Sequence, residues 1–351
     1  MGTIVKRIST EDLDHIVNHT RPLWEAVRGK KIFITGGTGF FGKWLLESFI
    51  YCNEVLKLES SITVLSRNPE KFLAEFPFYA GYKNVSFLKG NVVDFEFPKE
   101  KYHFIIHAAT EADVKLNSEE PLLMLDTITA GTRRVLDFAK EQPVESFLLT
   151  SSGAVYGKQP NNVTHTKETD SFFIDINNPH SAYAEGKRLA ELYCSIYYQQ
   201  FGVPIKIARC FAFVGPYLPL DKHFAIGNFI LNVLNHQDII VKGDGSPYRS
   251  YLYASDLMIW LWTVLFIGKS CFPYNIGSDE DYSIEEIAKI LACLHKPMLP
   301  INIQKQKKEN TSIDRYVPSI DRIKKDLILF PYVNLSDAII KTYRWTNKYF
   351  Q

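Results

Sequence analysis

The stretch that decides the fold is KIFITGGTGFFGKWLLESFIYCN, residues 31–53. It begins with a short apolar run, typical of a buried strand, and continues into a helical pattern. Between them lies a turn with three glycines, Gly36, Gly39 and Gly42, spaced G-x-x-G-x-x-G. Glycines at such a strand–helix turn let the backbone approach a pyrophosphate at the N-terminus of the helix. We therefore predict that this turn binds a dinucleotide.

The position of the glycine pattern makes the prediction specific, because it directly follows the first strand of a βαβ unit. One glycine serves the tight turn, one the close approach to phosphate and one the packing of the helix on the sheet. The candidate cofactor contacts from this turn are Gly36, Thr38, Gly39, Phe40, Phe41 and Gly42.

Downstream, the sequence keeps alternating strand-length apolar runs with helical patterns. Alternation of this kind is typical of parallel strands joined by right-handed helical crossovers. We therefore predict an α/β fold with a doubly wound parallel sheet. The further strands are expected at residues 61–67, 84–90, 102–110, 146–152 and 203–215, and the main later helices at 121–142 and 180–201.

Residues outside this alternation suggest an extension and a second lobe. Ser9 and Asp12 are placed as a capping box before an extra helix over residues 9–28, which we interpret as a packing or oligomer contact. Beyond Gly215 the segments are shorter and richer in proline and aromatic residues. The predicted domains are a helical extension (1–29), a dinucleotide-binding domain (30–215, with 240–270 returning to it) and a smaller C-terminal substrate-binding lobe (216–239 and 271–351).

Composition excludes several other classes of protein. The 351 residues are 46% hydrophobic and 23% charged, which is ordinary for a globular chain. A formal net charge of +1 gives no field to hold nucleic acid or an anionic membrane, so we expect neither as a partner. The most apolar segment, residues 257–268, is too short to cross a bilayer and is expected to be a buried helix.

The cysteines and the N-terminus bear on cellular location. The five cysteines are scattered and contain no C-x-x-C pair, which indicates reduced thiols. The first twenty residues show no signal-peptide pattern. We expect a cytoplasmic protein.

The end of the second strand bears on which nicotinamide cofactor fits. An NAD site usually offers a carboxylate there to the ribose hydroxyls. This chain has Ser66-Arg67-Asn68 instead, and a guanidinium beside a small hydroxyl suits a 2′-phosphate. NADP is therefore favoured over NAD, although Arg67 could also stack on the adenine or face solvent. Asp94, after the third strand, is a candidate acceptor for the adenine amine or simply a turn residue.

Two further segments carry residue types suited to catalysis. The fifth strand ends at Ser152, at the carboxyl edge where open α/β sheets place their chemistry. The following helix, HSAYAEGKRLAELYC (180–194), places Tyr183 and Lys187 four residues apart, so that their side chains are neighbours on one face. Taken alone, this pair could be structural.

Together these elements resemble the extended short-chain dehydrogenase/reductase family, in its nucleotide-sugar epimerase/dehydratase branch. The resemblance rests on the three glycines, Ser152 and Tyr183-x-x-x-Lys187 in that order, and it covers about residues 31–295. Further matching segments are HAAT (107–110), RCFAFVGPY (209–217), GDGSPYRSYLYASDL (243–257) and YNIGS (274–278).

The resemblance implies a Rossmann domain, NADP or NAD as cofactor, and Ser152, Tyr183 and Lys187 as catalytic residues. A phenol titrates near pH 10, but a cation one helical turn away favours the phenolate and brings the pKa toward neutrality. Lys187 would also hold the nicotinamide ribose, and Ser152 would donate a hydrogen bond to the substrate oxygen. Ala108 and Ala109, in HAAT, are implied cofactor contacts.

The resemblance also implies a nucleotide-diphosphate sugar as substrate. Arg249 matches the phosphate-binding arginine of the family, and a guanidinium fork suits a diphosphate. Asn228 is the second implied phosphate contact, and Glu111 is a candidate substrate contact that could equally begin a solvated helix. Ala212 stands where the family usually has an asparagine, which removes one expected contact. His107, His180 and His223 lack metal-ligand spacing, so no metal site is expected.

One departure from the family narrows the reaction. Sugar 4,6-dehydratases carry an Asp-Glu pair directly after the active-site Ser or Thr, and this chain has Gly153 and Ala154 there, which cannot move protons. A 4-keto-sugar reductase is slightly favoured over a 4-epimerase because of Arg67. A dinucleotide-sensing protein without catalysis is the non-enzyme alternative. The helices at 121–141 and 180–201 carry apolar stripes, which could simply cover the sheet. The resemblance implies that they pair as a four-helix bundle across a two-fold axis, in a homodimer.

Overall fold

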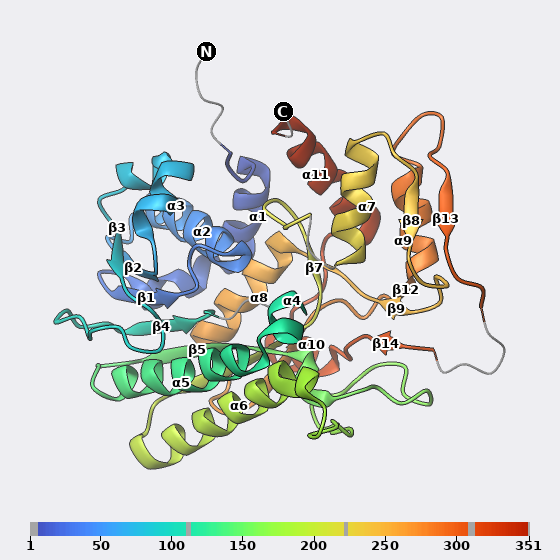
Figure 1. Cartoon of the computed structure of the whole chain (residues 1–351). Coiled ribbons are helices and arrows are strands. Elements are labelled where there is room, and N and C mark those ends of the chain that lie inside the picture. Colours follow the sequence, from blue (N-terminus) through green and yellow to red (C-terminus); the bar gives the residue numbers. More distant parts are fainter. Residues whose placement is uncertain (1–5, 110–113, 221–223, 308–312, 350–351) are drawn as a thin grey trace. The chain divides into compact units, whose positions relative to one another are not determined.

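The computed structural model describes residues 6–109, 114–220, 224–307 and 313–349 (Figure 1). The chain divides into two compact units. Unit 1 comprises Met1–Val155, Ile174–Arg209 and Met258–Tyr274, and unit 2 comprises Tyr156–Phe173, Cys210–Leu257 and Asn275–Gln351. The domain limits expected from the sequence stay a prediction.

A seven-stranded sheet forms the centre of unit 1 and confirms the predicted doubly wound α/β fold. Its order is β11-β6-β5-β4-β1-β2-β3, and the β1–β2, β1–β4, β2–β3 and β4–β5 pairs are parallel. The strand order reverses direction at β1 and β4, where such sheets bind ligands. The strands are β1 (Lys31–Thr35), β2 (Ser61–Ser66), β3 (Val85–Lys89), β4 (Phe104–His107), β5 (Ser146–Ser152), β6 (Ile205–Cys210) and β11 (Pro273–Ile276).

Helices join these strands, and α5 and α6 lie side by side along the sheet (Figure 1). Their inner faces contribute Met124, Ile128, Ala190 and Cys194 to a buried core shared with β1, β4, β5 and β6. The helical elements of unit 1 are α1 (Thr10–Thr20), η1 (Arg21–Val27), α2 (Phe40–Leu56), α3 (Pro69–Glu75), η2 (Pro77–Gly81), α4 (Val114–Glu119), α5 (Pro121–Lys140), η4 (Pro179–Ser181) and α6 (Ala182–Phe201).

The N-terminal extension is only partly the helix that the sequence predicts. Ser9 caps α1, since its hydroxyl accepts the backbone N–H of Asp12 at 3.2 Å. The α-helix ends at Thr20, because Pro22 cannot continue its hydrogen bonding, and the chain goes on as the 3₁₀ segment η1. The backbone N–H of Ile8 donates to the fully buried Glu47 carboxylate of α2 at 3.0 Å, which attaches the extension to the helix of the glycine turn.

Residues 257–267 of the apolar segment lie within α8 (Ala254–Ile267), and residues 257–265 are buried, so the predicted buried helix is confirmed up to its last turn. Trp260 and Trp262 are fully buried, and the Trp262 indole donates to the Ser48 hydroxyl at 2.9 Å. Within the described residues, no helix has both the length and the apolar character that crossing a membrane requires.

Unit 2 is built from short strands and helices around its own core. That core includes Ile226, Phe229, Tyr253, Ile287 and Ile339. A three-stranded sheet, β12-β9-β14, is accompanied by the pairs β10–β7 and β13–β8. The elements are β7 (Phe213–Val214), α7 (Ala225–Leu234), β8 (Ile239–Val241), β9 (Tyr248–Arg249), β10 (Leu252–Tyr253), β12 (Tyr282–Ser283), α9 (Ile284–Ala292), β13 (Ile301–Ile303), β14 (Arg315–Tyr316), α10 (Asp321–Leu327) and α11 (Leu335–Lys348).

Candidate active site

The glycine turn between β1 and α2 is shaped by two glycines that the fold itself requires. Gly36 has φ +73°, and a Cβ there would lie 2.5 Å from the carbonyl carbon of Ala108. A Cβ on Gly42 would overlap the backbone of Gly37. The turn can therefore pack against the end of β4 and against its own helix only when both positions lack side chains.

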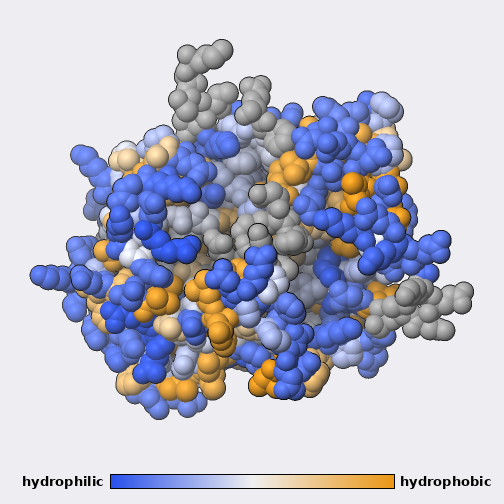
Figure 2. All heavy atoms as spheres, in the orientation of Figure 1, coloured by the Kyte–Doolittle hydropathy of each residue, from blue (hydrophilic) through white to orange (hydrophobic). Residues whose placement is uncertain are grey.

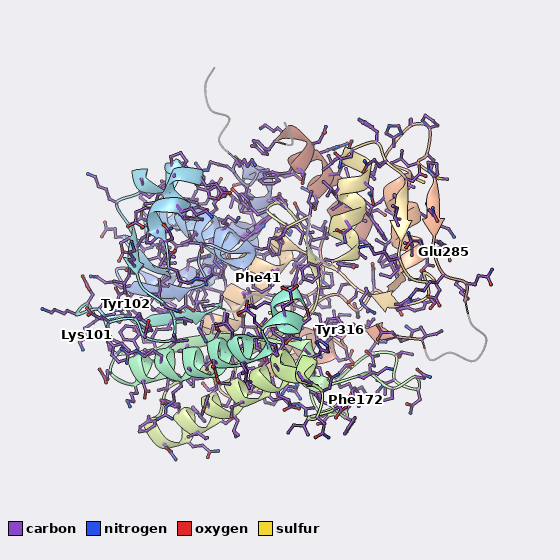
Figure 3. All side chains as sticks on the ribbon, in the orientation of Figure 1. Phe41, Lys101, Tyr102, Phe172, Glu285 and Tyr316 are labelled. Atoms are coloured by element: carbon purple, nitrogen blue, oxygen red, sulfur yellow. The ribbon has the colours of Figure 1, made fainter. Side chains whose placement is uncertain are left out.

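Gly39 has a different environment. It is exposed, and a Cβ there would meet the Gly36 carbonyl oxygen at an ordinary 3.5 Å. The N-terminus of α2 has no side-chain cap bonded to its first N–H groups, which a helix leaves without internal partners. Such an uncapped helix end fits a pyrophosphate. Thr38 lies in the same turn and Phe40 and Phe41 begin α2, with Phe41 marked in Figure 3.

The predicted adenosine contacts lie at the ends of β2 and β3. Arg67 directly follows β2 and is exposed, and no other described residue forms an ion pair or hydrogen bond with its guanidinium. Asn68 caps α3 by accepting the Lys71 N–H at 2.9 Å. Asp94 lies in a turn after β3 with its side chain exposed, and its N–H donates to the Asn91 carbonyl at 3.2 Å. Arg67 is therefore available to a phosphate.

The end of β4 connects the glycine turn to β5, which carries Ser152, through buried hydrogen bonds. The His107 ring lies 2.8 Å from the Thr35 hydroxyl and 3.1 Å from that of Thr132. The Thr35 hydroxyl also accepts the Ala109 N–H at 3.2 Å, and the Thr150 hydroxyl donates to the His107 carbonyl at the same distance. Burial, helped by the Lys187 charge, lowers the pKa of His107 to about 3, so this ring is neutral.

The three residues predicted to be catalytic all belong to unit 1, on β5 and the adjacent α6. Lys187 is 4% exposed and its ammonium donates to the Thr150 carbonyl at 2.9 Å, two residues before Ser152. The same ammonium lies 5.9 Å from the centre of the Tyr183 ring. The Ser152 oxygen accepts the Ala154 N–H at 3.1 Å, while its proton has no acceptor among the described residues. The Ser152 hydroxyl can therefore donate to a substrate.

Helix α6 also holds the chain on either side of Ser152. Arg188 donates to the Val155 carbonyl at 2.6 Å, beyond Ser152. The Ser151 hydroxyl donates to Glu191, whose carboxylate is bound by Arg209 at 2.7 Å. These contacts fix the strand end against the helix that carries Tyr183. These contacts could not be predicted from the sequence, because they join residues far apart in the chain whose spacing shows no local pattern.

Two of the predicted substrate contacts, Asn228 and Arg249, belong to unit 2. Asn228 is half-buried in the first turn of α7. Arg249, on β9, donates to Asp314 at 2.6 Å. A second arginine, Arg315, lies on the neighbouring strand β14, and its guanidinium is 4.1 Å from the centre of the Tyr248 ring. Glu111 lies outside the described residues.

The geometry therefore fits a nicotinamide dinucleotide and acid–base chemistry next to it. The glycine turn and the N-terminus of α2 would hold the pyrophosphate, and Ser152, Tyr183 and Lys187 lie on the elements that follow at the carboxyl edge of the sheet. This combination defines the class of dinucleotide-dependent enzymes that act on a hydroxyl or carbonyl group.

Comparison with known proteins places the chain within that class. Residues 32–277 match the NAD dependent epimerase/dehydratase family, and the chain belongs to that family. A nicotinamide dinucleotide is thereby its cofactor, as predicted. UDP-glucuronic acid decarboxylase 6 of Arabidopsis thaliana is 30% identical over 88% of this chain and 86% of its own length. UDP-glucuronic acid decarboxylase 1 of Xenopus tropicalis is 29% identical over 91% and 72%.

Solved structures share the fold at lower identity. An epimerase from Methanothermobacter thermautotrophicus superimposes with a TM-score of 0.80 at 24% identity, covering 95% of this chain and 97% of its own. UDP-glucuronic acid 4-epimerase from Bacillus cereus, solved in complex with UDP-glucuronic acid and NAD, gives 0.76 at 22%, covering 92% and 100%.

Proposed function

We propose that the protein is a nucleotide-diphosphate-sugar oxidoreductase that reduces a 4-keto sugar with NADPH. The observation that carries the oxidation–reduction chemistry is the set of residues on β5 and α6, and the preference for a reductase that uses NADPH rests on Arg67. The set comprises a hydrogen-bond donor (Ser152), a phenol (Tyr183) and a buried cation (Lys187), and Ser152 is followed by two residues, Gly153 and Ala154, that cannot exchange protons. This set suits proton transfer at one oxygen and at no second site.

Each residue has one task in this reaction. A nicotinamide dinucleotide held at the glycine turn would supply the hydride for the new C–H bond at C4. Tyr183 donates its phenolic proton to the C4 oxygen as the carbonyl π bond breaks, and Lys187 stabilises the resulting phenolate. Ser152 donates a hydrogen bond to the same oxygen and stabilises the negative charge that develops there. A proton from solvent then restores the phenol.

Dehydration and decarboxylation need more than this set provides. Loss of water across C5 and C6 requires a base at C5 and an acid at the C6 hydroxyl. Loss of carbon dioxide from a 4-keto uronic acid leaves an enolate that must be protonated at C5. Gly153 and Ala154 supply no acid or base for either reaction. Several curated relatives are nevertheless UDP-glucuronic acid decarboxylases. A nucleotide-linked uronic acid therefore belongs in the test panel as an expected negative for decarboxylation.

The choice of NADPH rests on Arg67. Its guanidinium is exposed at the end of β2 and forms no ion pair or hydrogen bond with another described residue, so binding a 2′-phosphate would break no protein contact. Arg249 and Asn228, in unit 2, are the proposed contacts of the substrate diphosphate. Arg249 would exchange its bond to Asp314 for a phosphate oxygen.

A 4-epimerase is the second candidate. It would oxidise C4 and reduce it again from the other face, with the same three residues moving the same proton. The lack of further acid–base groups beside Ser152 is as compatible with this cycle as with a single reduction. The difference lies in cofactor retention, since an epimerase needs its dinucleotide to stay bound between the two half-reactions.

The test is a substrate panel with three readouts. The purified protein is incubated with UDP- and dTDP-linked 4-keto-6-deoxyhexoses and NADPH or NADH, and with UDP-glucose, UDP-galactose and UDP-glucuronic acid. We expect NADPH oxidation and a product two hydrogens heavier from a 4-keto sugar. Interconversion of C4 epimers without net cofactor use would establish the second candidate instead. No change in any sugar would refute both.

A further inference from the structure

The helix that carries Tyr183 begins without a side-chain cap of its own. Ser181 occupies the N-cap position of α6, but its hydroxyl donates to the Asp175 carbonyl at 2.6 Å and caps no helical N–H. Tyr183 is the second residue of this helix, so its N–H is one of the donors that a helix leaves without an internal partner.

The partner comes from α4, 66 residues earlier in the chain. The Asn117 side-chain oxygen accepts the Tyr183 N–H at 3.0 Å, and the Asn117 amide nitrogen donates to the His180 carbonyl at 2.7 Å. A backbone N–H can only donate and a carbonyl can only accept, so both contacts fix the same orientation of the amide. One side chain thus holds both sides of the junction between η4 and α6.

In the chain, Ala108 and Asn117 both belong to the crossover between β4 and α5. The Ala108 carbonyl carbon lies against Gly36 of the glycine turn, and α4 contacts both η4 and α5. Leu116, next to Asn117, packs on the same buried cluster as Tyr183. Figure 1 shows α4 next to the start of α6. Asn117 therefore links α4 to the start of the helix that carries Tyr183.

We infer that Asn117 is a positioning residue for Tyr183. This inference rests on the proposed function, in which the Tyr183 oxygen moves a proton at the sugar. Asn117 acts through the backbone of Tyr183 and contacts no reacting atom. Because proton transfer requires hydrogen-bond distance, a small displacement of the helix start lowers the rate of the chemical step more than it weakens binding.

Three variants separate positioning from general stability. Asn117→Leu removes both contacts at similar size, and Asn117→Asp keeps an acceptor for the Tyr183 N–H but loses the donor to His180. Asn178→Ala is the matched control. The Asn178 side chain caps η4 by accepting the His180 N–H at 3.0 Å, and its removal would leave both Asn117 contacts in place. For each variant we would measure thermal stability, the dissociation constant of NADPH, and kcat and KM for a sugar that the wild type converts.

Positioning predicts a loss in kcat alone. Asn117→Leu should lower kcat at least tenfold, while KM and the NADPH dissociation constant stay within about twofold of wild type. Asn117→Asp should recover most of that loss, and Asn178→Ala should stay near wild type. The inference is wrong if Asn117→Leu keeps kcat within threefold, if Asn178→Ala loses as much, or if NADPH binding falls in parallel with kcat.

Amide hydrogen exchange at Tyr183 tests the inference even if the proposed function fails. If the wild type converts no sugar in the panel, the proposed function is rejected, but the inference about Asn117 can still be tested. Exchange of the Tyr183 amide should still be at least tenfold faster in Asn117→Leu than in wild type or Asn178→Ala. Equal exchange in all three proteins would overturn the role of Asn117, whichever sugars react.

Discussion

The Lys187 ammonium donates a 2.9 Å hydrogen bond to the carbonyl oxygen of Thr150, two residues before Ser152. Helix α6 and strand β5 are thereby joined at the site of the proposed chemistry, and the buried cation lies 5.9 Å from the centre of the Tyr183 ring. The bond offsets part of the cost of burying a lysine at 4% exposure, since a backbone carbonyl satisfies one of its three donors.

Substitution of the phenol should separate chemistry from binding. We expect Tyr183→Phe to abolish hydride transfer while dinucleotide binding survives, because the ring still packs but the titratable oxygen is gone. Lys187→Met should lose both rate and some cofactor affinity. Stopped-flow measurement of NADPH oxidation and fluorescence titration of NADPH check the two effects. Activity of Tyr183→Phe within tenfold of wild type would contradict the assigned mechanism.

Arg67 should control the choice between the two nicotinamide cofactors. Arg67→Asp replaces an attraction to a 2′-phosphate by a repulsion, so preference should shift toward NAD by at least ~1.4 kcal/mol, a tenfold change. Lys71→Asp is a nearby control, since it makes the same change of charge at a different position, in the first turn of α3. If NADPH affinity in Arg67→Asp equals that of the wild type in a titration, Arg67 does not bind the phosphate.

The outer faces of α5 and α6 should form a dimer interface. Leu122 is 76% exposed and Leu192 is 54% exposed, and both line a groove of about 760 Å³ between the beginnings of the two helices. Figure 2 shows hydrophobic side chains over the part of this face where Figure 1 places α5 and α6. Pairing of these faces around a two-fold axis would bury this surface.

Light scattering tests the dimer directly. We expect a dimer at micromolar concentration and a monomer for Leu192→Glu, because a carboxylate would be buried unpaired in the interface. Val55→Glu, at an exposed apolar position near the end of α2, should leave the mass unchanged. A strictly monomeric wild type would refute the interface.

The protein should not remove water from a nucleotide-linked glucose. Gly153 and Ala154 begin a short 3₁₀ segment directly after Ser152 and carry no group that exchanges protons. Incubation with NAD and UDP- or dTDP-glucose should therefore leave the C6 oxygen in place. A 4-keto-6-deoxy product, lighter by one water in mass spectrometry, would overturn the assignment of a single proton-transfer site.

His107 should make unit 1 sensitive to acid. Its folded-state pKa of about 3 lies below the ordinary value of 6.5, so the unfolded chain binds the proton more readily. The stability contributed by the neutral ring is fully present above about pH 6.5 and is lost as the pH falls toward 3. His107→Gln should therefore show a shallower decline of melting temperature between pH 6.5 and 5 than wild type. His19→Gln, at an exposed position, should decline as wild type does.

The sequence by itself determined the features that local spacing encodes. A strand–glycine–helix stretch can be read directly, because the turn requires glycines at Gly36 and Gly42 for steric reasons that hold in any chain. Tyr183 and Lys187 were predictable as neighbours since four residues make one helical turn. The alternation of strands and helices likewise gave the doubly wound sheet, although β11, with four residues and no pattern of its own, was missed.

Only the tertiary structure decided which distant residues support these motifs. Asn117 meets Tyr183 across 66 residues, and Lys187 meets Thr150 across 37. Arg249 meets Asp314 across 65. Such partners leave no periodic signal, because their distance depends on how crossovers of variable length pack on the sheet. Side-chain type and spacing therefore indicate what chemistry is present, while packing decides which groups hold the reacting atoms in place.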